Sequence, residues 1–355
     1  MAKYSNVKKP AFFIPWTDYL QSIGNIIYQD NNLNDIHILN PAKTHTIKPE
    51  DDWWVDGQIE HRIDFNKTSW YSAISDLDDY IYIFILGHNF GHSQCAIDIE
   101  FRDDNVDGVE VWKQTTIRES VINDLGANSP PDRNGFSIFK AKWPNWNVQG
   151  MKIIIRGFDS ASNSDIKVGS VSMCTKWTAP HNPDLSIKMS KEYDGVKTLT
   201  TKGGATLSNA SYTRGGTYWV NSYPWEIPYG VGSGSSDYPS TNGYIARERT
   251  LGRRVWDMNF SYLSDSDIMP EFESMWIYGT EYTDAYNKNI LDSHSFFARV
   301  LNRVQGSHLP FIFLPNDENT NPDQWAIARF DQKKFDIMQS APNLYNLKLN
   351  IRESW

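Results

Sequence analysis

Short stretches in which hydrophobic and polar residues alternate recur along the chain and predict a protein built mainly from β-strands. Residues 96–102 set Ile97, Ile99 and Phe101 against charged neighbours, as expected where successive side chains point to opposite faces of a sheet. Residues 80–86 are apolar throughout, which is typical of a central strand covered on both faces. The other strands predicted in this half are residues 36–39, 59–65, 109–114, 151–156 and 166–173.

The first 180 residues are predicted to form a jelly-roll β-sandwich. Turn residues separate the strands and helical periodicity is almost absent, which is the pattern of a sandwich. The segment TAPHNPD, residues 178–184, is the predicted boundary with a second domain over residues 181–355. A chain of 355 residues suits two domains better than one.

The second domain is predicted to be α+β, an antiparallel sheet with one packed helix. Residues 253–263 alternate, with Trp256, Met258, Phe260 and Tyr262 on one face and polar residues on the other. The other predicted strands are residues 309–314, 324–330, 334–338 and 344–352. The last of these predicts that the chain ends inside a sheet.

The helix is predicted over residues 293–305. Apolar residues recur there at helical spacing, Ser293 is placed to cap the first turn, and Gly306 is placed to end the helix. Residues 230–243 are rich in glycine and serine and predict a long loop. Because it contains Tyr238 and is followed by Tyr244, we expect this loop to act as an interface arm.

Composition and charge narrow the function classes. The net charge of −9 argues against a general binder of nucleic acids or anionic membranes. The longest apolar run, residues 80–86, is too short to cross a membrane. Two cysteines cannot form a disulfide framework. The 14 Trp, 18 Tyr and 17 Phe suit either extensive protein interfaces or carbohydrate binding.

One turn resembles the opening of a calcium loop. Asp103, Asn105, Asp107 and Gly108 match D-x-N-x-D-G, which supplies hard oxygen ligands around a sharp turn. The twelfth position is Gln114 and lacks the bidentate carboxylate of such a loop. A plain hairpin turn between two strands is therefore the preferred interpretation.

The first domain also contains a candidate ligand site. Trp53 and Trp54 follow two aspartates, and an indole face with neighbouring carboxylates suits a sugar ring. His88, Asn89 and His92 follow the predicted strand 80–86, at the rim where such sandwiches hold ligands. The two histidines are separated by a glycine outside any predicted helix, so a metal site is not the preferred reading. The alternative for the tryptophans is a place in the core or in an oligomer interface.

Catalytic signatures are missing from the sequence. It contains no G-x-S-x-G, P-loop, dinucleotide fingerprint or cysteine cluster. We therefore expect a non-enzymatic protein without a cofactor. The basic run RERTLGRR, residues 247–254, is expected to pair with an acidic neighbouring subunit rather than with DNA.

The C-terminal third resembles a known family. The blocks RERTLGRRVWDMNFSYLSDSDIMP, FFARVLNRVQGSHLPFIFLPNDENTNPDQWAIARF and LYNLKLNIRESW look like minor tail or distal-tail virion proteins of tailed bacteriophages. The N-terminal words YIYIFILGHNF and IKVGSVSMCTKWTAPHNPD resemble the galactose-binding-like jelly roll that often accompanies this tail domain. One departure is the order, since the usual arrangement puts the ring-forming domain first.

The resemblance implies a tail-tip component that forms a homo-oligomeric, commonly hexameric, ring between the tail tube and the host-binding apparatus. Its partners would be its own copies and other tail proteins, with DNA present only as it passes a channel, and its location would be the virion, assembled in the host cytoplasm. The alternative is a receptor- or carbohydrate-binding virion module that binds a host-surface glycan. The residues predicted at the oligomer interface are Arg253, Arg254, Trp256, Tyr238, Tyr244 and Trp355.

Overall fold

The computed structural model describes a β-rich chain. The described residues are 7–18, 26–28, 36, 39, 45–47, 54–55, 58–65, 80–87, 96–103, 111–114, 118–120, 136–142, 150–156, 166–192, 196–210, 253–269, 294–320 and 324–354. The prediction of a mainly β protein is confirmed.

The strands of the chain range in length from two to 12 residues. Those of the first half are β1 (Ala11–Pro15), β2 (Ile26–Tyr28), β3 (His45–Ile47), β4 (Trp54–Val55), β5 (Gln58–Phe65), β6 (Tyr80–Leu86), β7 (Ala96–Asp103), β8 (Val111–Gln114), β9 (Arg118–Ser120), β10 (Phe136–Lys142), β11 (Gly150–Arg156), β12 (Ile166–Val168) and β13 (Ser170–Thr178). Those of the second half are β14 (Lys188–Glu192), β15 (Val196–Thr200), β16 (Thr206–Ala210), β17 (Arg253–Ser264), β18 (Phe311–Leu314), β19 (Ala326–Phe330), β20 (Ile337–Ala341) and β21 (Leu344–Glu353). Two short helical elements, α3 (Asp265–Ile268) and η4 (Phe297–Leu301), accompany them.

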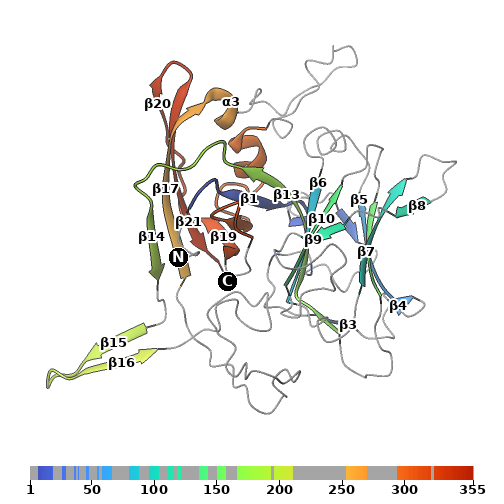
Figure 1. Cartoon of the computed structure of the whole chain (residues 1–355). Helices are drawn as coiled ribbons and strands as arrows, with labels where there is room; N and C mark the ends of the chain where they lie inside the picture. The colour runs from blue at the N-terminus through green and yellow to red at the C-terminus, as the bar shows by residue number, and fades with distance from the viewer. Residues whose placement is uncertain are drawn as a thin grey trace, which may run out of the picture.

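One antiparallel sheet of 11 strands forms the centre of the molecule, in the order β14-β17-β21-β19-β18-β1-β13-β6-β10-β9, with β20 paired to β21. A second sheet has the order β2-β5-β11-β7-β8, with β4 on β5. Figure 1 shows this second sheet beyond the β13-β6-β10-β9 end of the large one. The large sheet therefore contains strands from both halves of the chain.

Strand β1 joins those halves. It pairs with β13 on one side and with β18 on the other, so that Phe12 lies opposite both Trp177 and Phe313. Its side chains alternate between two hydrophobic clusters. Phe12 and Ile14 enter the cluster under β17 and β21, and Ala11 and Phe13 enter the cluster with Phe84 of β6. The N-terminal strand is thus buried on both faces, although it was not among the strands predicted from the sequence.

Strand β17 follows the predicted alternation up to Phe260 and then departs from it. Trp256, Met258 and Phe260 are buried, as an inward face requires. A β-bulge shifts the pairing with β21 between Phe260 and Leu263, so that Leu263 is buried and Tyr262 is 73% exposed. A one-residue shift reverses the face of every later side chain. The prediction that Tyr262 shares the inward face is therefore wrong.

The helix predicted over residues 293–305 is present only in part: η4 is a π-helix of five residues, Phe297–Leu301, followed by turns. This helical segment packs on the first cluster. Its residues Phe296, Val300 and Val304 lie in the same cluster as Phe12. The Ser295 hydroxyl accepts a hydrogen bond from the backbone N–H of Ala298 (3.3 Å), whereas Ser293 lies outside the described residues. The predicted end at Gly306 is too late, since η4 ends at Leu301 and turns follow it. Gly306 closes these turns with a φ of +72°, and its N–H donates to the carbonyl oxygen of Leu301 (2.9 Å).

Two further strand predictions need correction. Ile36 lies in a helical turn and Leu39 in a bend, and the backbone N–H of Leu39 donates to the Asp18 carboxylate instead of to a neighbouring strand. The strand predicted at 334–338 is displaced to β20 (Ile337–Ala341), which turns directly into β21 through Pro342 and Asn343. Asn343 adopts a φ of +61°, which asparagine tolerates well.

We predict that Phe12→Ala lowers the free energy of unfolding by about 3–5 kcal/mol. Phe12 is fully buried and its ring lies 5.3–6.2 Å from those of Trp177, Phe296, Phe311, Phe313 and Phe330. Denaturant unfolding measures the change. Lys333→Ala, at an exposed residue, is the control and is expected to change stability by no more than about 0.5 kcal/mol. Equal losses in the two variants would contradict a central role for β1.

Candidate functional site

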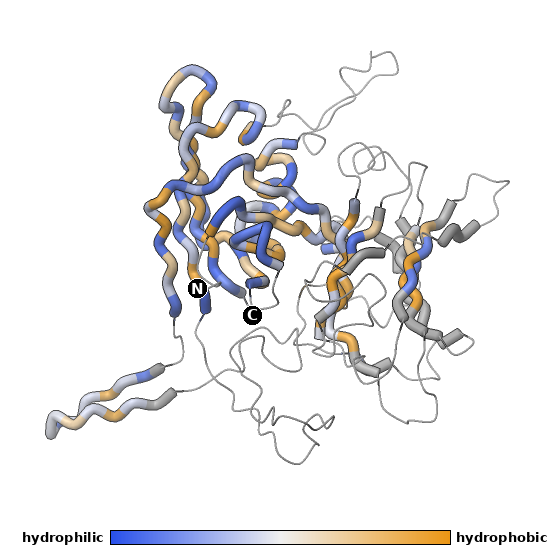
Figure 2. Tube along the Cα trace, viewed as in Figure 1, coloured by the Kyte–Doolittle hydropathy of each residue, from blue (hydrophilic) through white to orange (hydrophobic). Residues whose placement is uncertain are grey.

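Strands β15 and β16 form a hairpin, here called the arm, that stands away from the large sheet (Figure 1). Leu199 lies directly opposite Leu207 on one face of this two-stranded ribbon. The two side chains are 67% and 59% exposed, and neither belongs to a hydrophobic cluster of the described part of the chain. Figure 2 shows hydrophobic positions among hydrophilic ones along the projecting hairpin. The arm therefore presents an apolar pair to the surroundings of the molecule.

The turn of the arm is built from its local sequence. The N–H of Gly204 donates to the carbonyl oxygen of Thr201 (2.9 Å), and the N–H of Thr201 donates to that of Ala205 (2.9 Å). Gly204 has a φ of +82°, a conformation that glycine adopts without steric cost. The Thr201 hydroxyl also donates to the Ala205 carbonyl oxygen (3.2 Å). This three-residue hairpin loop fixes the register that sets Leu199 opposite Leu207.

The arm is positively charged in an acidic protein. Lys197 and Lys202 are its ionisable residues, and it has no aspartate or glutamate. Lys197 shares the face of the two leucines, while Thr198 and Ser208 form a pair on the other face. The leucine face thus combines apolar and cationic groups, which suits a partner surface with apolar and acidic groups.

A two-stranded hairpin that packs on nothing is marginally stable in water. Fully burying a leucine side chain contributes about 1.5–3 kcal/mol. The stability of the arm therefore increases most when another surface covers Leu199 and Leu207. This property distinguishes a binding element from an ordinary surface loop.

The arm follows β14, which is an edge strand of the large sheet. β14 is paired with β17, and Lys188 and Glu192 at its two ends are exposed. An ion pair between Glu192 and Arg352 (2.8 Å) connects the arm end of β14 to the terminal strand β21. The base of the arm is in this way fixed to the sheet that holds the C-terminal strand.

Three residues predicted at the oligomer interface have roles within the chain itself. Trp256 is 1% exposed and lies in the first hydrophobic cluster, so it is a core residue. Arg254 binds both carboxylate oxygens of Glu353, at 2.9 Å and 3.1 Å, and donates to the carbonyl oxygen of Trp325 (2.6 Å). Arg253 is half-buried on the same strand. Because Glu353 is 2% exposed, the Arg254 pair stabilises the end of β21 rather than contacting solvent.

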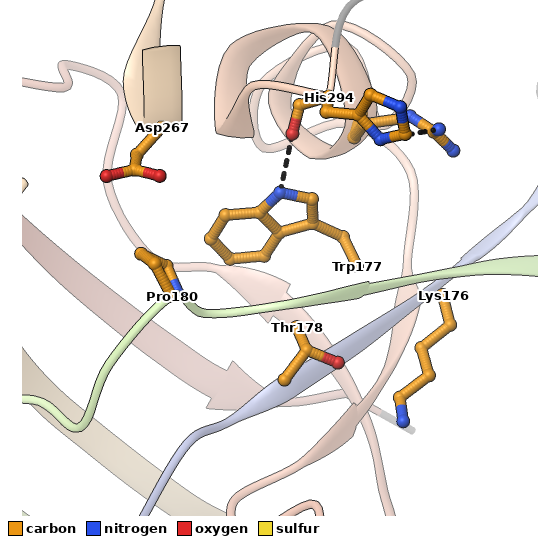
Figure 3. Close-up of a pocket in the computed structure, with 7 residues that line it drawn as sticks. Lys176, Trp177, Thr178, Pro180, Asp267 and His294 are labelled. Atoms are coloured by element: carbon orange, nitrogen blue, oxygen red, sulfur yellow. Dashed lines mark hydrogen bonds between the residues drawn. The ribbon is translucent and has the colours of Figure 1, made fainter. Parts of the chain in front are cut away.

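A small pocket opens beside the boundary segment (Figure 3). Its volume is about 250 Å³, and it is lined by Lys176, Trp177, Thr178, Pro180, Asp267, His294 and Arg299. The Trp177 indole N–H donates to the carbonyl oxygen of His294 (2.9 Å), and the ring packs on Phe12 and Phe296.

The polar groups around this pocket are occupied by structural contacts. The Asp267 carboxylate accepts from the N–H and hydroxyl of Ser264 at the start of α3, and Lys176 pairs with Asp317 at 2.6 Å. Trp177 is therefore a packing residue. The arm is a better candidate for function than this pocket.

A buried carboxyl group lies where β1 ends. Asp18 is 6% exposed, and its Oδ2 accepts from the N–H of Leu39 (3.3 Å). Burial raises the pKa of Asp18 to about 8, although the Leu39 hydrogen bond and the positive charge of Arg329 act in the opposite direction. Burial, followed by the nearby Asp18 charge, likewise raises the pKa of the Cys174 thiol, which keeps it protonated and unreactive. This cluster belongs to the core around β1 and not to an open site.

The residues predicted as ligand sites fall largely outside the described part of the chain. These are Trp53, His88, Asn89, His92, Asn105 and Asp107, together with the interface candidates Tyr238, Tyr244 and Trp355. Trp54 lies in β4, beside Val55, and Asp103 ends β7, where it pairs with Val111 of β8. The calcium-like motif thus follows one strand of an antiparallel pair and precedes the other, as a hairpin turn would. Among the described residues, no group of three or more potential metal ligands gathers.

Sequence reasoning missed the arm, although a signal for it was present. VKTLT and TLSNA flank TKGGA with an alternation of period two, and paired runs around a glycine-containing loop indicate a hairpin. We instead assigned the arm to residues 230–243, which are not among the described residues.

No protein-family model, no curated protein and no solved structure matches this chain. Among the described residues, none of the helices has the length and apolar character needed to cross a membrane.

We predict that the Asp18→Asn variant becomes increasingly more stable than wild type as the pH rises from about 4 to about 8. The folded protein keeps the Asp18 proton up to a pKa of about 8, whereas the unfolded chain releases it near 3.8. The wild type therefore loses up to about 1.4 kcal/mol of stability per pH unit in this window relative to the asparagine variant. Urea unfolding of both proteins at pH 4, 6 and 8 measures the difference. A difference that stays constant with pH would contradict the burial of a protonated carboxyl.

Proposed function

We propose that this chain is a structural virion protein of a tailed phage, assembled in the host cytoplasm, whose copies associate into a ring at the tail tip. The observation that supports self-association most directly is the arm. It carries an exposed pair of leucines, Leu199 and Leu207, on a hairpin anchored to a large and well-packed sheet. Such an element is typical of a protein that completes its packing against another subunit.

The body of the protein supports a structural role. The first hydrophobic cluster contains the large side chains Trp256, Phe313 and Phe330. The terminal strand β21 lies between β17 and β19, with Arg254 and Glu353 paired at its end. A rigid sheet of this kind can hold neighbouring subunits at a fixed orientation. The paired charges of Arg254 and Glu353 stabilise the sheet itself.

The family resemblance of the C-terminal third supports the tail assignment, and the fold suits it. We propose that residues 1–180 contribute a jelly roll and residues 181–355 the ring-forming unit. The antiparallel pairs β5-β11-β7 beside β13-β6-β10 support a sandwich, with Met151 and Phe101 opposite one another in a buried row. β1 would then be a strand of the first unit that continues the sheet of the second. The ring would contact other tail proteins and enclose a channel for DNA.

We predict that Leu199→Asn combined with Leu207→Asn, here called the arm variant, abolishes self-association at micromolar concentrations. The wild type is expected to sediment as a species several times the 40.9 kDa chain mass, and the arm variant as the single chain. Losing two leucine contacts weakens association by at least about 100-fold, since about 1.5 kcal/mol per leucine is removed at each contact. Analytical ultracentrifugation at matched concentrations gives the masses.

The matched control is Thr198→Asn combined with Ser208→Asn, which alters the paired positions on the other face of the arm. Both double variants leave the net charge unchanged and place two asparagines in the hairpin. We expect the control to sediment like the wild type. Self-association that survives in the arm variant would reject the arm as the assembly element, and a monomeric wild type would reject the proposed function itself.

A further inference from the structure

Exposed apolar side chains gather at two opposite ends of the sheet. The arm follows Glu192, which pairs with Arg253 at the start of β17. Tyr262 and Met338 lie near the other end of β17 and on β20, with exposed fractions of 73% and 67%. β17 has 12 residues, so these ends are about 36 Å apart at 3.3 Å per residue. Figure 1 shows the arm at the bottom of the view and α3 and β20 at the top.

Tyr262 and Met338 belong to one surface patch. The backbone N–H of Tyr262 donates to Asn346 Oδ1 (3.4 Å), and Met338 lies directly opposite Asn346 in the β20-β21 pair. Leu185, which is fully exposed, reaches the same end because its neighbour Asp184 accepts a hydrogen bond from Ser261 (2.7 Å). We call the surface formed by Leu185, Tyr262 and Met338 the apolar patch.

Tyr262 is exposed, although the alternation of β17 up to Phe260 would place its side chain on the buried face. The bulge after Phe260 turns this aromatic side chain outward, and its backbone adopts a φ of +63°. A non-glycine residue with positive φ is strained, and strain of this kind is concentrated at functional sites. The conformation therefore points to a role for Tyr262 at the surface.

The charges of α3, beside the patch, are opposite to those of the arm. Asp265 is exposed and Asp267 half-buried in the first turn of α3, directly after β17. On the β20 side, Lys334 is paired with Asp336 (2.6 Å). The arm contributes Lys197 and Lys202 without any acidic residue. An arm with leucines and lysines thus complements a patch with apolar side chains and carboxylates.

We propose that the apolar patch is the receiving surface for the arm of a second copy of this chain. The proposal rests on the proposed self-association and specifies its contact. Leu199 and Leu207 of one copy cover Tyr262 and Met338 of the next, while Lys197 lies toward the carboxylates of α3. Because the two surfaces are at opposite ends of the chain, the contact is head-to-tail, and repetition closes into a ring or continues as a filament.

A mixing experiment tests this contact with two complementary variants. The patch variant combines Tyr262→Asn with Met338→Asn, and asparagine is chosen because it tolerates the positive φ at position 262. The arm variant keeps an intact patch, and the patch variant keeps an intact arm. Each variant alone is expected to be monomeric, and a 1:1 mixture is expected to form a heterodimer that grows no further. Sedimentation velocity measures the species, and thermal unfolding shows that both variants are folded.

The outcomes separate this inference from the proposed function. If the patch variant assembles like the wild type while the arm variant does not, self-association stands and the receiving surface is wrong. If both variants are monomeric and their mixture stays monomeric, the head-to-tail contact is rejected, since an intact arm and an intact patch are then both present and do not bind one another. If the wild type is itself monomeric, both proposals fail. Gln339→Asn, next to Met338 on the opposite side of β20, is the matched control and is expected to assemble normally.

Discussion

The insertion of β1 between β18 and β13 is the contact on which the rest of the structure depends. A five-residue strand, Ala11–Pro15, supplies ladder hydrogen bonds on both edges and side chains on both faces. Phe12 and Ile14 fill one hydrophobic cluster and Ala11 and Phe13 fill the other. Without it, β18 and β13 would each present an unpaired edge at the centre of the sheet. The N-terminal and C-terminal parts of the chain therefore both contribute strands to one continuous sheet.

Because the sheet is continuous, the two ends of β17 have a fixed distance and orientation relative to one another. The register of β17 with β14 places the arm at one end, and the bulge in β17 turns Tyr262 outward at the other. The pairs between Arg254 and Glu353 and between Glu192 and Arg352 hold the strands at the arm end in register. The Arg254–Glu353 pair, whose carboxylate is buried, specifies this arrangement more than it adds stability. In copies joined end to end, the sheet would therefore set the angle between neighbouring subunits.

Much of the fold follows from the periodicity of the sequence. The predicted strands at 59–65, 80–86, 96–102 and 344–352 correspond closely to β5, β6, β7 and β21, because alternation or complete burial leaves a clear pattern. The helical segment was predicted from apolar residues at helical spacing, although η4 ends at Leu301, earlier than predicted. The features that the sequence pattern did not predict depend on contacts between residues far apart in the chain. β1 is too short to be distinguished from any apolar stretch until β13 and β18 are known to flank it.

The candidate site was less predictable than the fold. Periodicity marked Trp256 as a strand residue but could not say whether its face met the core or another subunit, and the structure places it in the core. The bulge that exposes Tyr262 depends on the pairing of β17 with β21, and a single strand carries no signal for it. The arm was the exception, since its glycine-containing loop and the alternating residues on either side indicate a hairpin. Its exposure could not be predicted, because exposure depends on which surfaces the rest of the chain covers.

Negative-stain electron microscopy of the purified full-length chain tests the central claim most directly. The account predicts closed rings of uniform diameter in which each subunit contacts two neighbours through opposite ends. Uniformly scattered single particles of one chain, at concentrations well above micromolar, would contradict it.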